Sequence, residues 1–76
     1  MQTYKRGEDV KLDVGKLLLA MANSCMNATE LADKSKVSRG TLTKCLSGKS
    51  NPRPATIGMI AKALDVSVED LIERRP

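Results

Sequence analysis

Residues 38–46, SRGTLTKCL, bring several hydrogen-bonding side chains together within a short stretch. The segment carries a guanidinium, two threonine hydroxyls and an ammonium group beside a glycine. In a helix, residues four positions apart lie on the same side, so most polar residues of this segment fall on one face. That outward face comprises Arg39, Gly40, Thr43 and Lys44. Leu42, Cys45 and Leu46 fall on the other face and predict its buried side.

These four outward residues suit the base edges of the DNA major groove. Arg39 can donate two parallel hydrogen bonds to O6 and N7 of guanine. The alternative is a surface arginine that contacts only phosphate, and its place in the first turn favours the base. Thr43 offers a hydroxyl group and a methyl group that suits the methyl group of thymine, and Lys44 can reach a guanine or a phosphate. Gly40 either allows close approach of the backbone or only weakens the helix.

Residues 27–48 supply the elements that position this face. They predict a helix over 28–35, a short turn, and a second helix over 38–46. The first helix begins with an asparagine followed by an acid three residues later, which is a capping-box pattern, and Ser38 is a strong N-cap for the second. Tight turns between helices often need a positive φ, which glycine adopts at little cost. Lys36 in the turn therefore implies either strain or a modified turn.

The segments on both sides of this pair supply further helices. Asp13 is a good N-cap, and apolar residues at steps of three and four predict an amphipathic helix over 14–24. Leu19 widens the apolar face of that helix, so it is either buried within the domain, which is the default, or available to a partner chain. After a loop with two prolines, a helix begins at Pro54 or the next residue, and Ser67 caps a last short helix.

The pattern predicts an all-α domain over residues 13–73, a compact bundle of five short helices without a regular strand. Residues 1–12 are expected to form a mostly irregular arm, with a short extended piece possible over 10–12. The stretch 4–6 can contact DNA phosphates or simply be solvated. Residues 74–76 are expected to form a tail.

Composition limits what such a domain can do. The chain has 76 residues, enough for one small domain, and its net charge of +4 and pI near 9.3 favour a polyanionic partner. It contains two cysteines and no histidine, so a zinc site, which takes about four ligands, is excluded. Cys25 and Cys45 are expected to be half-buried free thiols in a reducing cytosol rather than a disulfide.

Other function classes find no support in the sequence. No segment approaches the ~20 apolar residues needed to span a membrane, and the N-terminus has no signal-peptide layout. A soluble cytoplasmic protein is therefore expected. No catalytic triad, phosphate-binding glycine loop or metal cluster is recognisable, so the sequence predicts no enzyme activity, no cofactor and no bound metal.

Two longer stretches, ELADKSKVSRGTLTKCLSGKSNP and TIGMIAKALDVSVEDLI, resemble the phage repressor and Cro-like helix-turn-helix family. The resemblance covers about residues 13–73 and rests on five segments that agree in order and spacing. It implies a lambda-repressor-like fold in which 28–35 is the positioning helix and 38–46 is the recognition helix. It also implies base reading by the four outward residues and support of that helix by Thr41 and Leu42. The positions expected near phosphates are Ser38, Ser47, Lys49 and Arg53.

The chain departs from the family pattern at three positions. A glutamine that contacts a phosphate is common where this chain has Ala28, and an arginine is common where it has Met21. The turn position that is usually a glycine in the family is Lys36 in this chain. The loss of two phosphate contacts either weakens binding or moves those contacts onto Lys36, Lys49 and Arg53.

The expected function is sequence-specific binding of double-stranded DNA by a transcriptional regulator, a repressor with helix 38–46 in the major groove. One such module buries on the order of 600–1,000 Å² on DNA. A homodimer on a palindromic operator is therefore expected, with half-sites about one helical turn apart. The last helix or Leu19 can supply the dimer contact, with intramolecular packing as the alternative for both. The competing hypothesis is an antitoxin-like module that mainly binds another protein.

Overall fold

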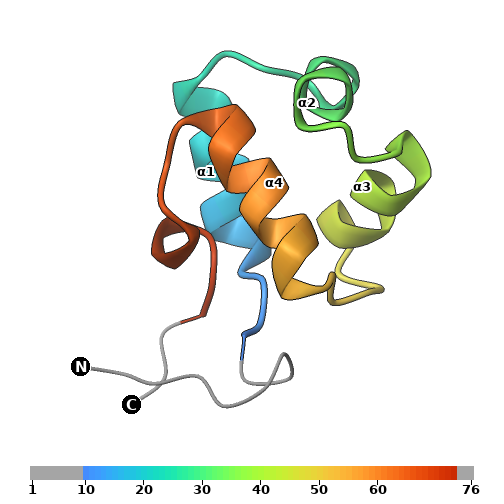
Figure 1. Ribbon diagram of the computed structural model, residues 1–76, viewed down its shortest axis with the longest axis vertical. Helices are drawn as coiled ribbons and strands as arrows, with labels where there is room; N and C mark the ends of the chain where they lie inside the picture. The colour runs from blue at the N-terminus through green and yellow to red at the C-terminus, as the bar shows by residue number, and fades with distance from the viewer. Residues whose placement is uncertain (1–9, 74–76) are drawn as a thin grey trace.

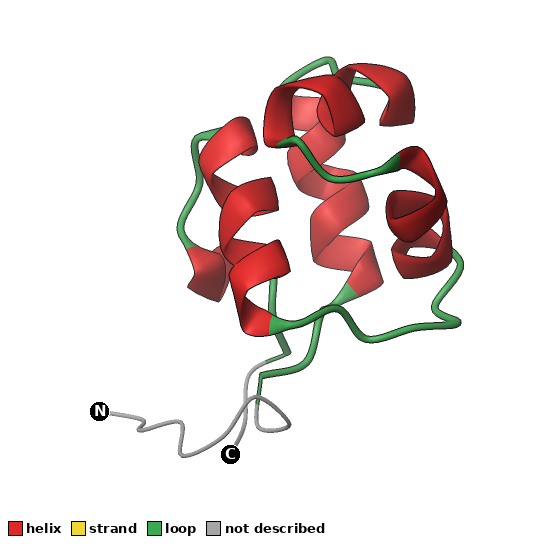
Figure 2. Cartoon of the chain, turned by 45° about the vertical axis from the view of Figure 1, so that its right-hand side comes forward, coloured by secondary structure: helices red, strands yellow, loops and turns green. Residues whose placement is uncertain are grey.

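Four α-helices and one turn of 3-10 helix build the domain (Figure 1, Figure 2). The computed structural model describes residues 10–73 of the chain. The elements are α1 (Val14–Asn23), α2 (Ala28–Ser35), α3 (Arg39–Leu46), α4 (Pro54–Leu64) and the 3-10 helix η2 (Val68–Asp70). The predicted all-α class is confirmed, and the fifth predicted helix is a single 3-10 turn. The predicted contacts of residues 4–6 lie outside the described residues.

Side-chain caps explain where α1 and α2 begin. Asp13 Oδ1 accepts a hydrogen bond from the backbone N–H of Lys16 at 3.2 Å, which satisfies one of the unpaired donors in the first turn. At α2, Asn27 Oδ1 accepts from the N–H of Glu30 at 2.8 Å, while Glu30 Oε1 accepts from the N–H of Asn27 at 3.0 Å. The predicted capping box is therefore present. α1 ends at Asn23, one residue earlier than predicted.

The last helical segment is short because the chain after it pairs with the start of the domain. The N–H of Leu71 donates to the carbonyl oxygen of Val68 at 2.9 Å, which is the i to i+3 bond of a 3-10 helix. The next residue, Ile72, forms an isolated antiparallel bridge with Leu12. Extended backbone at this bridge ends the helical conformation.

Two hydrogen bonds flank that bridge and join the first and last described segments. The N–H of Asp13 donates to the carbonyl oxygen of Leu71 at 2.8 Å, and the N–H of Glu73 donates to the carbonyl oxygen of Lys11 at 2.7 Å. Residues 10–12, predicted as the end of an irregular arm, are therefore attached to the body of the domain. The extended piece considered for these residues is present as the bridge segment.

Branched aliphatic side chains fill most of the core, since the sequence has only 1% aromatic residues. The largest fully buried side chains are Leu17, Leu31, Leu42, Cys45, Ile57, Ile60 and Leu71. Val10 and Leu12 belong to the same buried cluster. α2 packs on both α3 and α4, and α1 packs on α3, so helices outside the α2–α3 pair hold it in place.

The outer side of α1 differs from the prediction. Leu18 is 52% exposed and Leu19 is 63% exposed, so the default burial of Leu19 within the domain is wrong. The helix buries Leu17, Ala20 and Met21. Leu18 and Leu19 point away from that side, because each residue advances about 100° around the helix axis. α1 therefore presents an apolar outer face.

The two cysteines have different surroundings. Cys45 is buried in the core, whereas Cys25 is exposed and adopts a φ of 55° just after α1. Both are free thiols, as predicted. The expectation that both are half-buried is wrong, because Cys45 faces inward from α3 and Cys25 lies in the turn beyond the end of α1.

Candidate nucleic-acid interface

The turn between α2 and α3 is fixed by its backbone and by one buried serine. Lys36 caps the end of α2 in the left-handed conformation, with φ 65° and ψ 19°, and its N–H donates to the carbonyl oxygen of Ala32 at 3.0 Å. A lysine thus adopts the positive φ that favours glycine, so the strained alternative is the one present. Val37 follows with only 7% exposed, and its N–H donates to Ser35 Oγ at 3.3 Å.

Ser38 fixes the start of α3, as predicted. Its Oγ accepts from the N–H of Thr41 at 3.2 Å and donates to Thr41 Oγ1 at 2.9 Å. Leu42 and Cys45 hold the inner side of the helix in the core.

Burial raises the pKa of the Cys45 thiol, which favours the neutral form. Thr41 is exposed, so of the two residues implied to hold this helix only Leu42 does so by packing.

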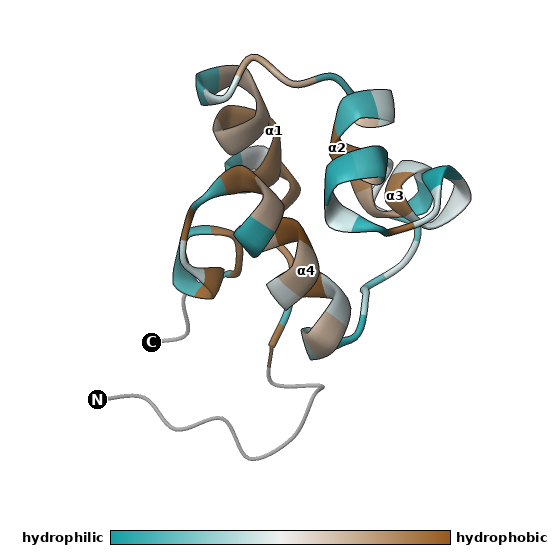
Figure 3. Ribbon diagram, turned by 45° about the horizontal axis from the view of Figure 1, so that its top comes forward, coloured by the Kyte–Doolittle hydropathy of each residue, from teal (hydrophilic) through white to brown (hydrophobic). Residues whose placement is uncertain are grey.

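The side chains predicted to read bases lie together on the exposed side of α3. Arg39, Gly40, Thr43 and Lys44 are all exposed and form two pairs spaced four residues apart. Figure 3 shows hydrophilic colours on the outer turns of α2 and α3. A Cβ atom added at Gly40 would meet nothing within 4 Å. Glycine inside a helix costs about 0.5–1 kcal/mol relative to alanine, and no neighbouring atom of the described chain requires it here.

The loop between α3 and α4 carries two of the cations predicted to contact phosphates. Gly48 adopts a φ of 77° directly after the cap of α3, a position that favours glycine. Lys49 and Arg53 are both exposed, whereas Pro52 is buried between them. Pro54 then occupies the first turn of α4, with Arg53 at its N-cap. The loop therefore has one buried residue, Pro52, between two exposed cations.

Two of the residues predicted near phosphates use their hydroxyl hydrogens within the domain. Ser38 Oγ donates to Thr41 Oγ1, and Ser47 Oγ donates to the carbonyl oxygen of Lys44 at 3.0 Å. Both serines are exposed, so a phosphate can approach them. It must compete with these internal bonds for the hydroxyl hydrogen, which makes the serines weaker donors than the cations.

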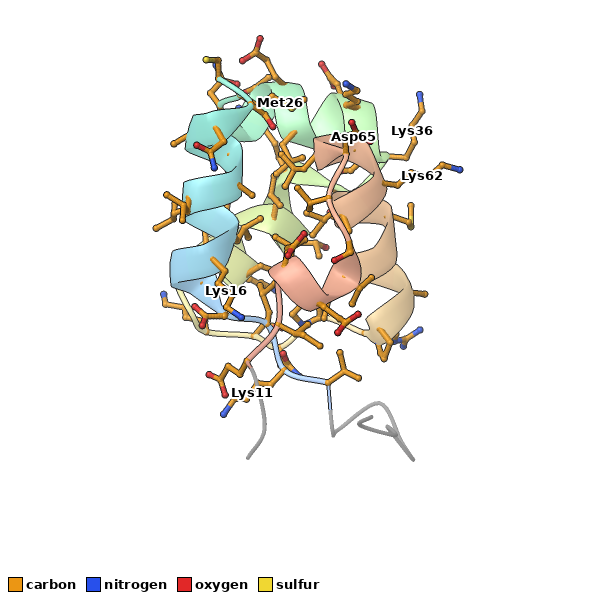
Figure 4. All side chains as sticks on the ribbon, turned by 90° about the vertical axis from the view of Figure 1, so that its left-hand side faces the viewer. Lys11, Lys16, Met26, Lys36, Lys62 and Asp65 are labelled. Carbon is orange, nitrogen blue, oxygen red and sulfur yellow. The ribbon has the colours of Figure 1, made fainter. Side chains whose placement is uncertain are left out.

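Charge along this part of the chain has one sign. Residues 34–64 contain no aspartate or glutamate. The basic residues in that range are Lys34, Lys36, Arg39, Lys44, Lys49, Arg53 and Lys62. Residues 65–73 have the opposite balance, with four acids and no base. The side chains of Lys36 and Lys62 point outward on the same side of the molecule (Figure 4). The segment that carries α3 therefore attracts polyanions.

Metal clusters and membrane-crossing helices are absent from the described part of the chain. Over residues 10–73, no group of three or more histidine, cysteine, aspartate or glutamate side chains could hold a metal ion. Across the same residues, no helix is long and apolar enough to cross a membrane.

A family model matches the segment that contains this interface. The Cro/C1-type HTH DNA-binding domain matches residues 16–76, which include most of α1 and all later elements. The chain belongs to this family. No curated protein and no solved structure gave a match. Cro/C1-type domains bind DNA and are typically not enzymes. The match confirms the resemblance inferred from the sequence.

Two departures from the Cro/C1-type pattern are apolar contacts in this chain. Met21 is buried with 7% exposed, and Ala28 is half-buried against the core. Neither side chain has a polar group to offer a phosphate. Lys36, by contrast, is exposed at the turn, and it is a cation where the pattern has a glycine.

Sequence patterns do not reveal one polar contact of the α3–α4 loop. The N–H of Leu12 donates to Asn51 Oδ1 at 2.9 Å, and Asn51 Nδ2 donates to the carbonyl oxygen of Val10 at 3.2 Å. These partners are 39 and 41 residues away along the chain. An asparagine before a proline indicates a turn, but no spacing rule connects it to a segment so far away.

Proposed function

We propose that the protein is a sequence-specific transcriptional regulator that inserts α3 into the major groove of double-stranded DNA. The observation that carries this proposal is the exposed polar face of α3 within the acid-free segment 34–64. Positive charge attracts phosphates regardless of sequence, and hydrogen-bonding groups at base edges add discrimination. Both properties occur on one helix.

Each exposed residue of α3 has a proposed role in reading bases. Arg39 donates two hydrogen bonds to O6 and N7 of guanine from the first turn. Thr43 places its methyl group against a thymine methyl group, and Lys44 donates to a guanine or to the nearest phosphate. Gly40 lets the helix lie close to the base edges. The proposed phosphate contacts are Lys36, Ser38, Ser47, Lys49 and Arg53.

Selection of bound duplexes from a random pool, followed by gel shifts at several salt concentrations, tests these roles. Arg39→Ala is expected to cost ~1–3 kcal/mol at the selected site and to relax the preference at one base. Its folding should be unchanged because Arg39 is exposed. Lys49→Ala is expected to weaken all sequences alike and to lower the log–log salt slope by about one. If no duplex is bound at low salt, the proposed function is wrong.

We further propose a homodimer on a palindromic operator, joined through the outer face of α1. Leu18 and Leu19 are the most exposed large apolar side chains among the described residues. Gly15 and Ala22 are exposed three or four positions away, and alternating small and large residues let two identical faces interlock. Residues 17–29 carry no charge. Because the chain has a net charge of +4, a neutral face is where a second copy meets the least repulsion.

The proposed dimer is weak in the absence of DNA. α1 has ten residues and is therefore only about 15 Å long. A standard interface buries about 800 Å² per partner, which is more than one short helix face offers. Two half-sites about one helical turn apart hold the copies at a high local concentration, so dimerisation is expected to strengthen on the operator.

Leu19→Glu tests the proposed dimer face, with Met59→Glu as the matched control. Met59 is 42% exposed on α4, so its replacement adds the same charge at another surface. Leu19→Glu is expected to abolish both self-association in sedimentation equilibrium and cooperative binding to a two-half-site duplex, whereas Met59→Glu should preserve both. Equal behaviour of the two variants would place the interface elsewhere.

Repression is the proposed mode of control because occupancy of a promoter is sufficient for it. A reporter with the selected site across its promoter should lose expression when the chain is present, and Arg39→Ala should restore it. Increased expression of the reporter would mean that the protein is an activator rather than a repressor. A regulator works in the compartment that holds the DNA, so this proposal keeps the cytoplasmic location expected from the sequence.

The second candidate function is a module that mainly binds another protein through α1. The exposed pair Leu18 and Leu19 favours it, as do the apolar residues at positions 21 and 28. This candidate predicts a monomer at all concentrations and little DNA binding even at low salt. Those two measurements separate it from the proposed regulator.

A further inference from the structure

Asn51 completes the hydrogen bonding of a segment far from it in the chain. Its carboxamide accepts from the N–H of Leu12 at 2.9 Å and donates to the carbonyl oxygen of Val10 at 3.2 Å. In extended backbone, the C=O of one residue and the N–H two residues later point to the same side. The Asn51 amide therefore occupies the edge that a neighbouring strand would take.

The opposite edge of the same segment pairs with the C-terminal part of the domain. The bonds from Asp13 to Leu71 and from Glu73 to Lys11 lie on that edge. Figure 4 shows Lys11 where the first and last described segments run side by side. Because the bridge and the buried side chains of residues 10 and 12 fix this segment, Asn51 is bonded to the body of the domain rather than to another loop.

This attachment matters for the two cations on either side of Asn51. Lys49 lies two residues before it and Arg53 two residues after it, and both are exposed. Pro52 is buried directly beside Asn51. The amide and the proline ring thus hold residues 51 and 52, which lie between the two cations, and this restricts the backbone that carries both cations before any ligand arrives. A contact fixed in advance loses less entropy on binding than one on a loose loop.

We propose that Asn51 is a positioning residue of the DNA interface, which holds the α3–α4 loop so that Lys49 and Arg53 reach phosphates together. The inference rests on the proposed DNA binding and gives Asn51 no direct contact with a base. Its effect is on every sequence alike, because phosphate contacts carry no sequence information.

Asn51→Ala in the full chain tests the proposal on a random-sequence duplex. Its affinity is expected to fall on the order of ten-fold, and its log–log salt slope by about one to two, because two phosphate contacts weaken together. Asn23→Ala removes an exposed carboxamide at the end of α1 and should change neither quantity. An unchanged salt slope in Asn51→Ala contradicts the positioning role while leaving the proposed DNA binding intact.

A double-mutant comparison separates positioning from a general loss of stability. In a Lys49→Ala/Arg53→Ala background, Asn51→Ala should change affinity less than about two-fold, because its effect passes through the two missing cations. An equal loss in both backgrounds means that Asn51 acts only on folding. Asn51→Asp keeps the acceptor for Leu12 but sets a carboxylate oxygen against the carbonyl oxygen of Val10 and adds a negative charge between the two cations, so it should weaken binding more than Asn51→Ala.

Amide hydrogen exchange of the free protein tests the attachment without DNA. The Leu12 amide is expected to exchange faster in Asn51→Ala than in the wild-type chain, while the amides of α4 keep their protection. Unchanged exchange at Leu12 contradicts the attachment. A wild-type chain that binds no duplex at low salt contradicts the proposed function, and with it the role of Asn51 at a DNA interface.

Discussion

Gly40 is a residue whose role the sequence leaves open between close backbone approach and a weakened helix. The space where its Cβ would lie is empty of neighbouring atoms within 4 Å, so packing within the described domain gives no reason for glycine. We propose that the reason is another molecule, which approaches the outer side of α3. On this proposal, Gly40 lowers stability in the free protein and contributes to affinity only when the partner is bound.

Gly40→Ala is expected to raise the free energy of unfolding by about 0.5–1 kcal/mol while lowering affinity for the selected duplex. Urea denaturation and a gel shift measure the two effects. Gly58→Ala in α4 is the matched control, because its added Cβ also meets nothing within 4 Å, so it should stabilise the fold without affecting DNA binding. If Gly40→Ala keeps full affinity, close approach at this position is not needed.

Cys45 is expected to make the free energy of unfolding depend on pH in the alkaline range. Burial raises the pKa of its thiol in the folded chain, and unfolding returns the thiol to water and to its ordinary pKa of about 8.5. Between the two values the unfolded chain holds fewer protons, so the free energy of unfolding falls as pH rises. This contribution is fully present below the ordinary pKa and is lost as pH rises through the folded-state pKa.

In a Cys25→Ser background, urea titrations are therefore expected to show a steeper loss of stability above pH ~8.5 for the chain with Cys45 than for Cys45→Ala. The Cys25→Ser background removes the exposed thiol, so Cys45 is the thiol being compared. The comparison uses the slope with pH rather than the absolute stability, because the truncation also leaves a small cavity. Parallel slopes would show that Cys45 ionises as easily folded as unfolded.

At the scale of the elements, the turn between α2 and α3 combines backbone strain with a useful charge. Lys36 holds a φ of 65°, a conformation that costs roughly 1–2 kcal/mol for a residue with a Cβ. Lys36→Gly is expected to stabilise the fold by up to about that amount and to lower the salt slope of DNA binding by about one. Thermal unfolding and salt-dependent gel shifts measure the two changes.

Asp65→Gly provides the control for the turn. Asp65 caps α4 with a φ of 58°, so the same backbone strain is relieved there, but an acid is removed instead of a cation. It should stabilise the fold without lowering the salt slope. If Lys36→Gly leaves the slope unchanged as well, Lys36 makes no phosphate contact.

Elements whose ends depend on nearby residues could be predicted from the sequence. The caps at Asp13, Asn27 and Ser38 each join atoms three residues apart, a distance over which pattern rules apply. The bonds of Asn51 and the bridge at Leu12 join residues 39 or more positions apart, and only the folded chain brings them together.

The exposure of Leu18 and Leu19 could not be predicted for a related reason. A run of apolar residues shows that a helix is suited to burial, but the neighbouring helices decide which sides are covered. The outward side of α3 was predictable because its polar residues and its buried leucine and cysteine alternate at helical spacing. Its base contacts remain predictions, because they depend on the partner.

At the scale of the whole molecule, two residues that precede the predicted boundary at residue 13 are part of the core, and we propose that the domain includes them. Val10 and Leu12 are 8% and 7% exposed within the core, and backbone bonds tie their segment to residues 71–73. Burying two such side chains stabilises the fold by roughly 3–6 kcal/mol. That is a large share of the 5–15 kcal/mol by which a typical domain is stable.

A chain of residues 10–76 is therefore expected to be more stable than a chain of residues 13–76 by about 3–6 kcal/mol. Urea denaturation followed by circular dichroism measures the difference. Leu12→Ala in the full chain is the accompanying variant, and it should lose about 2–5 kcal/mol through the cavity it creates. Equal stability of the two truncated chains would mean that the bridge segment covers the core without stabilising it, and would return the boundary to Asp13.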